Sequence, residues 1–164
     1  MRKIRKNDQN GIKLNDTDKA LIALLQEDGR ASDVAVAKKL GVSNDTARRR
    51  RERLEREGAI KIKAHLNPRK FGYVHFLHLY VTVKPKVSTR EFAERVSRER
   101  NTYYVALSMG PEQRVLVHYR GKTEAEMYDF VEHLRNDSQV ASVEAHVVYE
   151  VVKVSYHSLD LGRE

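Results

Sequence analysis

The chain has 164 residues, and its 31 lysines and arginines outnumber its 23 aspartates and glutamates, which gives a formal net charge of +8. A length of this order fits one medium domain or two small ones, and an apolar share of 40% supports a hydrophobic core. The longest apolar run, residues 20–25, is far too short to cross a bilayer, and the absence of cysteine excludes disulfides and thiolate metal sites. These features favour a cytoplasmic protein without a membrane partner.

The positive charge is concentrated in the first part of the chain. Residues 1–66 hold 17 basic and 10 acidic side chains, whereas residues 67–164 hold 14 and 13. A basic surface on one domain suits a polyanion such as double-stranded DNA, because each cation placed against a phosphate releases bound counterions. Residues 1–13 are polar and show no periodicity, so we expect them to form a flexible basic arm.

A first helix is predicted to begin after Asn15. This residue is a candidate N-cap, and Asp18 follows three positions later, as in a capping box. Leucines then recur at helical spacing until Asp28 and Gly29. We expect Gly29 to end the helix in a left-handed conformation.

A second, short helix is predicted between the N-cap Ser32 and Leu40. Val34, Ala37 and Leu40 are spaced to share one face, which we expect to be buried. Gly41 follows directly and is expected to stop the helix.

The spacing between the second helix and a third one, expected over residues 43–58, indicates a helix-turn-helix unit. Such a unit needs a small residue where the helices cross, a glycine in the turn and an apolar residue after it. Ala37, Gly41 and Val42 occupy these positions. The amphipathic helix before them and the arginine-rich helix after them strengthen the prediction.

The third helix carries the candidate DNA contacts. Ala47 and Leu54 are expected to face the core, and the four consecutive arginines 48–51 sweep around the helix at 100° per residue, so only some of them face DNA. Exposed residues of the first turns enter the major groove in such a unit, while others meet phosphates. Base readout is expected of Asn44, Asp45, Arg48 and Arg49, and phosphate contact of Thr46, Arg50 and Arg53. Ser43, where the helix is expected to start, is a further DNA-binding candidate.

An ordinary solvated helix is the alternative for this segment, since pairs such as Arg48 with Glu52 and Arg51 with Glu55 have ion-pair spacing. The preceding turn favours DNA binding. Asp45 is unfavourable near phosphates, so we expect it to orient Arg49 or to accept a hydrogen bond from a cytosine amino group.

The remaining chain alternates between strand and helix patterns. Residues 60–66 alternate apolar and polar side chains and predict a linking strand inside a hinge at 60–72. Strands are then expected at 73–84, 103–109, 114–120 and 141–155, and helices at 89–100 and 123–136. This βαββαβ order is ferredoxin-like. The predicted fold class is α+β, with a helix-turn-helix domain at 14–59, a ferredoxin-like domain at 73–156 and a tail at 157–164.

Residues 14–73 closely resemble the leucine-responsive/asparagine-regulator (Lrp/AsnC) family of bacterial and archaeal transcription regulators. The marks are LNDTD, LLQEDGR, SNDTARRRRERLEREGAI and NPRKFGY, and residues 74–155 match the family in element order. The resemblance implies a winged helix-turn-helix regulator that binds specific DNA sites in the nucleoid. It also implies a homodimer that pairs sheet against sheet, further assembly into tetramers or octamers, and an amino-acid-type effector.

The strand pattern supports association. One face is expected to lie under the helices, and its residues with their helical partners are Leu77, Leu79, Val81, Val83, Phe92, Val96, Phe130, Val131 and Leu134. The opposite face is too apolar to remain in water, which is typical of an association surface. It is expected to carry Phe76, His78, Tyr80, Leu116, Val148 and Val152.

Two positions depart from the family pattern. Arg51 stands where an apolar residue is usual, so its aliphatic stem is expected to pack while its guanidinium reaches solvent. Effector-responsive members carry Gly-x-x-Asp between the second and third sheet strands, and this chain reads Gly110-Pro111-Glu112-Gln113. The candidate effector residues are Met109, Gly110 and Gln113. Gln cannot offer a carboxylate to an ammonium group, and a plain tight turn is the alternative.

Three histidines, His78, His118 and His146, fall on strands that a ferredoxin-like sheet places side by side, on the face opposite the helices. They could bind a metal or a haem-like ligand or act as a protonation switch, but histidines packed between sheets are far commoner. Siroheme decarboxylases share the scaffold, which keeps an enzyme as an alternative, and a nucleoid-type architectural protein without an effector is another. The arginine-rich helix favours the regulator, so we expect no enzyme activity, metal or cofactor.

Overall fold

The computed structural model describes residues 11–110 and 112–153. They form two compact units, one ending at His65 and the other beginning at Leu66, and each is described by itself. Of the expected basic arm only residues 11–13 belong to the described part, and the expected tail at 157–164 lies outside it.

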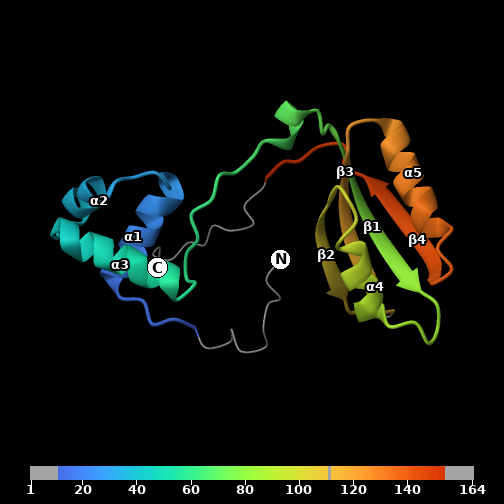
Figure 1. Ribbon diagram of the computed structural model, residues 1–164, viewed down its shortest axis with the longest axis horizontal. Coiled ribbons are helices and arrows are strands. Elements are labelled where there is room, and N and C mark those ends of the chain that lie inside the picture. Colours follow the sequence, from blue (N-terminus) through green and yellow to red (C-terminus); the bar gives the residue numbers. More distant parts are fainter. Residues whose placement is uncertain (1–10, 111, 154–164) are drawn as a thin grey trace. The chain divides into compact units, whose positions relative to one another are not determined.

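The first unit is built from three helices, α1 (Asp16–Glu27), α2 (Asp33–Leu40) and α3 (Asn44–Arg56) (Figure 1). Each begins where the sequence predicted, after Asn15, Ser32 and Ser43, because a side-chain oxygen of these N-cap residues satisfies a backbone N–H that has no partner in the first turn. The Asn15 side chain accepts a hydrogen bond from the Asp18 N–H at 2.9 Å, and the Asp18 carboxylate accepts one from the Asn15 N–H at 3.2 Å. The predicted capping box is confirmed.

The turn between α2 and α3 has the predicted geometry. Gly41 has a φ of 67°, in the left-handed region that favours glycine. The Val42 N–H donates to the Ala37 carbonyl at 3.1 Å and closes the turn. Ala37, Ala47 and Leu54 are fully buried, as the spacing predicted. The core of this unit consists of Leu21, Ile22, Val36, Ala37, Ala47 and Leu54.

Two details of these helices were predicted wrongly. Val34 is 61% exposed, and Val36 is buried in its place. Both valines fit a helical pattern with Leu40, and packing against the neighbouring helices selects between them. The end of α1 is also different, because Asp28 caps it in an extended conformation and Gly29 has no positive φ.

The predicted linking strand does not form in residues 60–66. A strand needs a neighbour for its backbone hydrogen bonds, and none of the described strands lies beside this segment. The described part of the first unit therefore has no wing strand. A short 3-10 helix, η1 (Pro68–Phe71), follows and ends at Gly72, whose φ is 83°.

The second unit contains a four-stranded antiparallel sheet of β1 (His75–Val83), β2 (Thr102–Ser108), β3 (Arg114–Gly121) and β4 (Val140–Val147). The strand order is β2-β3-β1-β4. Two helices connect the strands, α4 (Thr89–Val96) and α5 (Glu124–Arg135). The predicted βαββαβ order and the ferredoxin-like fold are confirmed.

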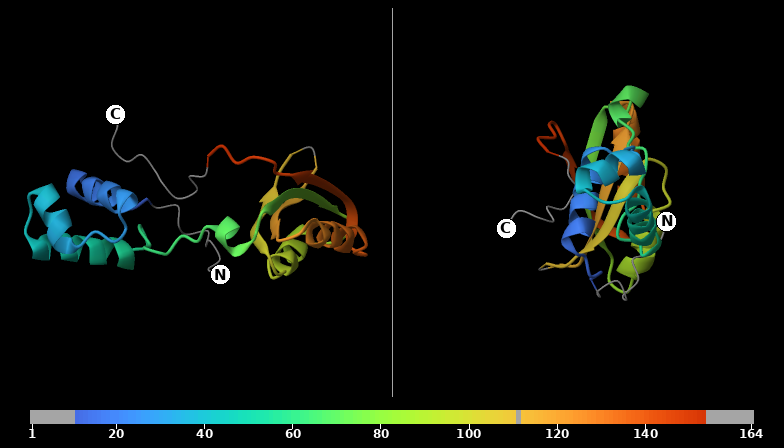
Figure 2. Two further views of the ribbon diagram at one scale, coloured as in Figure 1. Left: turned by 90° about the horizontal axis from the view of Figure 1, so that it is seen from above. Right: turned by 90° about the vertical axis from the view of Figure 1, so that its left-hand side faces the viewer.

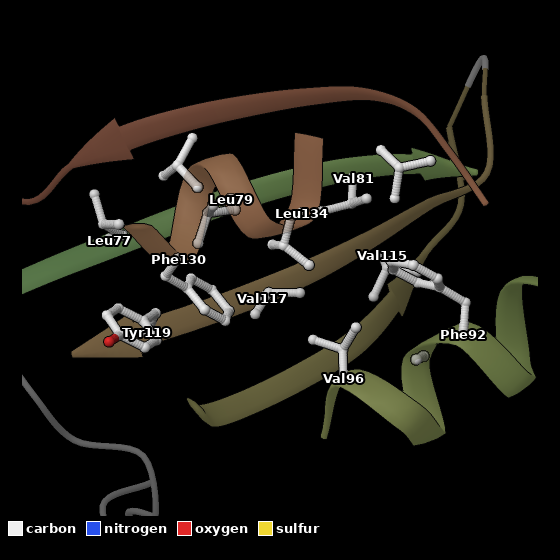
Figure 3. Close-up of a cluster of buried hydrophobic side chains, with 13 residues drawn as sticks. Leu77, Leu79, Val81, Phe92, Val96, Val115, Val117, Tyr119, Phe130 and Leu134 are labelled. Carbon is white, nitrogen blue, oxygen red and sulfur yellow. The ribbon is translucent and has the colours of Figure 1, made fainter. Parts of the chain in front are cut away.

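Both helices cover the same face of this sheet (Figure 2). Leu79 and Val81 of β1 point into the core, where they meet Leu134 of α5 and Phe92 of α4 (Figure 3). All four side chains are at most 1% exposed. In the part of this unit that the structure describes, neither α4 nor α5 covers the opposite face.

Two elements are shorter than predicted. Helix α4 ends at Val96, and the next residues form turns that lead into β2. Strand β4 ends at Val147, so of the strand predicted up to residue 155, residues 148–153 are not paired as a strand and the rest lies outside the described part. The Val148 N–H still donates to the Phe76 carbonyl at 2.9 Å, but β1 begins one residue earlier and offers no further partner. Val152 is 91% exposed rather than packed on the sheet.

No helix among residues 11–110 and 112–153 is long and apolar enough to span a membrane.

Candidate DNA-binding surface, histidine row and effector turn

The first turns of α3 present two exposed arginines. The side chains of Arg48 and Arg49 are 52% and 75% exposed, and Asn44 beside them is also exposed. At the N-terminus of α3 the Ser43 hydroxyl accepts a hydrogen bond from the Thr46 N–H at 3.2 Å, and the two hydroxyls lie 2.8 Å apart. The helix thus starts with polar groups and exposed cations together.

Asp45 holds both exposed arginines. Its Oδ1 accepts a hydrogen bond from Arg48 Nη2 at 2.8 Å, and its Oδ2 forms an ion pair with Arg49. Hydrogen bonds from Arg49 and Arg48 lower the pKa of Asp45 below its ordinary value of 3.8. Arg48 also donates to Glu52 at 3.2 Å. The expectation that Asp45 orients Arg49 agrees with this geometry.

Asp18 of α1 is a buried carboxylate that binds two arginines of α3. Its side chain is 1% exposed and accepts hydrogen bonds from Arg50 Nη1 at 2.9 Å and Arg53 Nη2 at 2.6 Å. Burial raises the pKa of Asp18, but hydrogen bonds from Arg53 and Arg50 outweigh it and lower that pKa below 3.8. Arg50 also donates to the Asn15 side chain at 3.2 Å. This cluster fastens α1 to α3.

Arg51 connects α3 to α2. Its Nη2 lies 2.9 Å from Asp33 Oδ2, and both side chains are about one-quarter to one-third exposed. The partner is therefore the acid in the first turn of α2, and not Glu55 as the solvated-helix alternative supposed. Its guanidinium, which was expected to reach solvent, instead forms an ion pair between two helices.

The four consecutive arginines thus fall into two groups, those that are exposed and those that bind an acid of another helix. Arg48 and Arg49 project from the surface, whereas Arg50 binds the buried Asp18 and Arg51 binds Asp33. Asp18 was predicted only as part of the capping box and not as a partner of these arginines. The sequence did contain a signal for this contact. Asp18 precedes the core residues Leu21 and Ile22 by three and four positions, which places its carboxylate on the buried face of α1.

The open face of the sheet carries the predicted histidine row. His78 on β1 is the Cα partner of His118 on β3 and of His146 on β4, and Tyr104 on β2 pairs with His118. Four rings from four neighbouring strands therefore follow one line across the sheet.

His118 lies inside this row. Its ring stacks on His78 with centroids 3.8 Å apart, and the ring of Tyr104 lies 4.7 Å away on the other side. The residue is 8% exposed, and its buried Nδ1 has no hydrogen-bond partner among the described residues. Burial, and to a lesser extent the neighbouring His78, lowers the pKa of His118 to about 4. Burial and then His146 also lower the pKa of His78.

His146 differs from the other two histidines because it has a carboxylate partner. Its Nε2 lies 2.9 Å from Glu144 Oε1, and Glu144 also accepts a hydrogen bond from Arg114 at 3.0 Å. No group of three metal-ligating side chains is placed to hold an ion in the described part of the chain.

The turn between β2 and β3 borders a small surface pocket of about 360 Å³. It is lined by Tyr80, Ser108, Gly110, Glu112 and Arg114. Of the three candidate effector residues, Gly110 lines this pocket. Met109 is 91% exposed, and Gln113 accepts a hydrogen bond from the Thr89 hydroxyl at 3.2 Å.

A helix-turn-helix unit with a cationic third helix, followed by a ferredoxin-like unit, defines a two-domain DNA-binding regulator. The family model of the AsnC-type helix-turn-helix domain matches residues 14–55. An HTH-type transcriptional regulator of Pyrococcus furiosus is 30% identical over 145 residues, which cover 87% of this chain and 97% of that relative. Another from Pyrococcus abyssi is 35% identical over 88 residues, and there the match spans only 53% of this chain and 55% of the relative.

The fold also matches solved structures. A transcriptional regulator from Neisseria meningitidis, crystallised as an L-Met complex, has a TM-score of 0.79 with 22% sequence identity, over 88% of this chain and 95% of that chain. The chain belongs to the Lrp/AsnC family of transcriptional regulators. Members of this family are regulators and not enzymes, and no finding supports the decarboxylase or architectural alternatives.

Proposed function

We propose that the chain is a sequence-specific DNA-binding regulator that acts as a homodimer and places α3 in the major groove. One observation carries this proposal: Arg48 and Arg49 project from the first turns of α3, directly after the Gly41 turn, and are both held by Asp45. Arginine donates two hydrogen bonds to guanine in the major groove, and asparagine suits adenine, so Asn44 joins them as a base-reading candidate.

The ion pairs of Asp45 with Arg48 and Arg49 favour DNA binding by these arginines. Long arginine side chains lose rotamer freedom when they bind DNA. Because Asp45 already restricts Arg48 and Arg49, less of this entropy is lost on binding. The arginines also neutralise the carboxylate, which reduces its repulsion of phosphates. The hydroxyls of Ser43 and Thr46 lie 2.8 Å apart at the start of α3, a position suited to a phosphate.

For Arg50 and Arg53 we revise the expected role. Phosphate contact would draw their guanidinium groups away from Asp18, whose side chain is 1% exposed, and leave a buried charge without its partners. We therefore assign both arginines to the orientation of α3 against α1.

The open sheet face supports the homodimer. On β1 the rings of Phe76 and Tyr80 lie on either side of His78, and Leu116 of β3 lies beside Tyr80. The charged side chains of Arg114, Arg120 and Glu144 share this face. Aromatic and apolar side chains mixed with polar and charged groups are usual in an interface, and a two-fold axis pairs such a face with itself. Family membership supports oligomerisation in general, and the dimer through this face is our proposal. Further assembly and nucleoid association remain proposals with it.

We place the effector at the pocket beside Gly110. Arg114 and Glu112 lie on its wall with opposite charges, which suits the carboxylate and the ammonium group of a zwitterion. The L-Met complex of the Neisseria protein supports an amino-acid-type effector. Gln113 binds Thr89, so Glu112 takes the place of the missing aspartate in this proposal.

The test is selection of bound fragments from random genomic DNA, followed by affinity measurements on the enriched site and on scrambled DNA. We expect one pseudo-palindromic motif and an affinity that falls steeply with salt. Arg49→Ala should reduce discrimination between the two DNAs by about 1–3 kcal/mol. The matched control is Arg135→Ala, which removes an exposed arginine of α5 and should change neither affinity.

Three results would count against the proposal. Salt-sensitive binding without an enriched motif would indicate an architectural protein, and equal losses on both DNAs for Arg49→Ala would remove it from base readout. A footprint without dyad symmetry would contradict the two-fold arrangement.

A further inference from the structure

The histidine row has no part in DNA or effector binding as proposed above, and its surroundings are unusual for titratable groups. His118 is enclosed by His78 on β1 and by Tyr103 and Tyr104 on β2, with ring centroids 3.8, 5.6 and 4.7 Å away. None of these rings carries a negative charge at neutral pH. A proton on His118 would therefore be desolvated without compensation from its nearest neighbours.

The charged groups around the row do not offer such compensation either. On β3 the neighbouring cation on the same face is Arg120, which lies over the rings of Tyr73 and Tyr103. On β4 the carboxylate of Glu144 is already shared by His146 and Arg114. Helices α4 and α5 lie on the other face of the sheet. No described carboxylate forms an ion pair with His78 or His118.

Protonation therefore works against this face in two ways. It places a charge in a poorly hydrated site, and a second proton puts like charges on two rings that are stacked 3.8 Å apart. A second copy of the chain on this face would increase both effects, because it removes water from the row and adds its own histidines across the two-fold axis.

We propose that the open sheet face is a proton-sensitive interface, on which two copies of this chain associate while His78 and His118 are neutral and separate when these side chains are protonated. The inference rests on the proposed homodimer and adds its regulation. The occupant is a second copy because the face carries the aromatic and apolar side chains of Phe76, Tyr80 and Leu116 beside charges of both signs, Arg114 and Glu144, which already pair with each other. Such a face can pack on itself about a two-fold axis without leaving a charge unpaired.

The sign follows from linkage. If association lowers the pKa of each imidazole further, the separated chains bind more protons, so acid favours separation. The pKa of His78 is already below 6.5 in one chain and that of His118 is about 4, so the effect begins below about pH 6.5 and grows toward pH 4. Because each chain can take up two protons, the dimer is expected to release up to four when it forms.

The experiment is sedimentation analysis of the full chain over a concentration series between about pH 7.5 and pH 4. We expect the dimer Kd to rise about tenfold or more over this range. Circular dichroism on the same samples separates dissociation from unfolding, since the helices of a folded monomer keep their signal.

The variant is His78→Phe combined with His118→Phe, which keeps two stacked rings and removes both titrating groups. Its dimer Kd is expected to change less than about twofold over the same pH range. If the double variant does not fold, His78→Phe alone should lessen the pH dependence. The matched control is His133→Gln, because His133 lies on α5 and is half exposed; it should keep the full response of the parent chain.

The outcomes are distinct. A dimer with a constant Kd across the range would overturn the proton linkage and leave the proposed homodimer intact. An unchanged response in the phenylalanine variants would overturn it as well, because other groups would then carry the protons. A chain that is monomeric at every pH would refute the homodimer of the proposed function and this inference with it.

Discussion

Substitution of Asp18 by asparagine should destabilise the first unit strongly. The carboxylate is 1% exposed and accepts hydrogen bonds from Arg50 at 2.9 Å, from Arg53 at 2.6 Å and from the Asn15 N–H at 3.2 Å. The asparagine amide has one acceptor oxygen and would direct an NH₂ group at a guanidinium. Loss of one partner of a buried ion pair costs about 3–5 kcal/mol. Because the two arginines are 28% and 34% exposed and reach water, we expect about 3 kcal/mol.

The assay is urea unfolding followed by circular dichroism of the helical signal near pH 7. With a slope of about 1 kcal/mol per molar urea for a unit this small, the midpoint of its transition should fall by about 3 M. The control is Asp16→Asn, which removes an exposed acid from the same helix turn and should cost about 0.3–1 kcal/mol. The stabilisation should persist above pH 3.8 and be lost as the pH falls through the lowered pKa of Asp18.

The double variant of Asp18→Asn with Arg53→Met tests the reasoning further. Removal of one buried charge leaves the others without compensation, so removal of two should cost less than the sum of the single changes. A loss for Asp18→Asn no larger than that for Asp16→Asn would refute the argument that this cluster fastens α1 to α3. Strict additivity in the double variant would refute the coupling.

Three further predictions concern His118, Gly41 and Arg51. Proton NMR should show the imidazole of His118 titrating near pH 4, and a midpoint above pH 6 would contradict the burial argument. Because burial lowers the pKa of His118 from 6.5 to about 4, about 3 kcal/mol of folding stability is lost as the pH falls from 6.5 to 4. Gly41→Ala should lower stability by about 1–2 kcal/mol in thermal unfolding, because φ is 67° there, whereas Gly29→Ala should be nearly neutral. Arg51→Leu should change stability by less than about 1 kcal/mol, since its ion pair with Asp33 is partly solvated; a loss above 2 kcal/mol in urea unfolding would show that the pair is essential.

Local signals in the sequence determined much of the fold. The N-caps Asn15, Ser32 and Ser43 were readable because each satisfies backbone groups only three residues away. Strand alternation likewise predicted that Leu79 and Val81 lie under the helices, because side chains on a strand change face at every residue. The same alternation predicted that the three histidines share the opposite face, and the strand register of the structure places them in one row.

These local signals could not predict contacts between residues that are far apart in the chain. The exposure of Val34 in place of Val36 depends on where neighbouring helices pack, and residues 60–66 alternate like a strand but have no described strand beside them. The candidate site shows the same limit. The sequence showed which residues of α3 are cationic, but their availability depends on acids that the fold brings near.

The sequence alone therefore determined the helix-turn-helix signature, the strand and helix order and the two faces of the sheet, because each depends on residues a few positions apart. Only the tertiary structure decided that Arg50 and Arg53 turn inward to Asp18, more than thirty residues away, while Arg48 and Arg49 remain exposed. The physical reason is that a buried charge must find its partners in space, and sequence spacing does not fix which side chains come within reach.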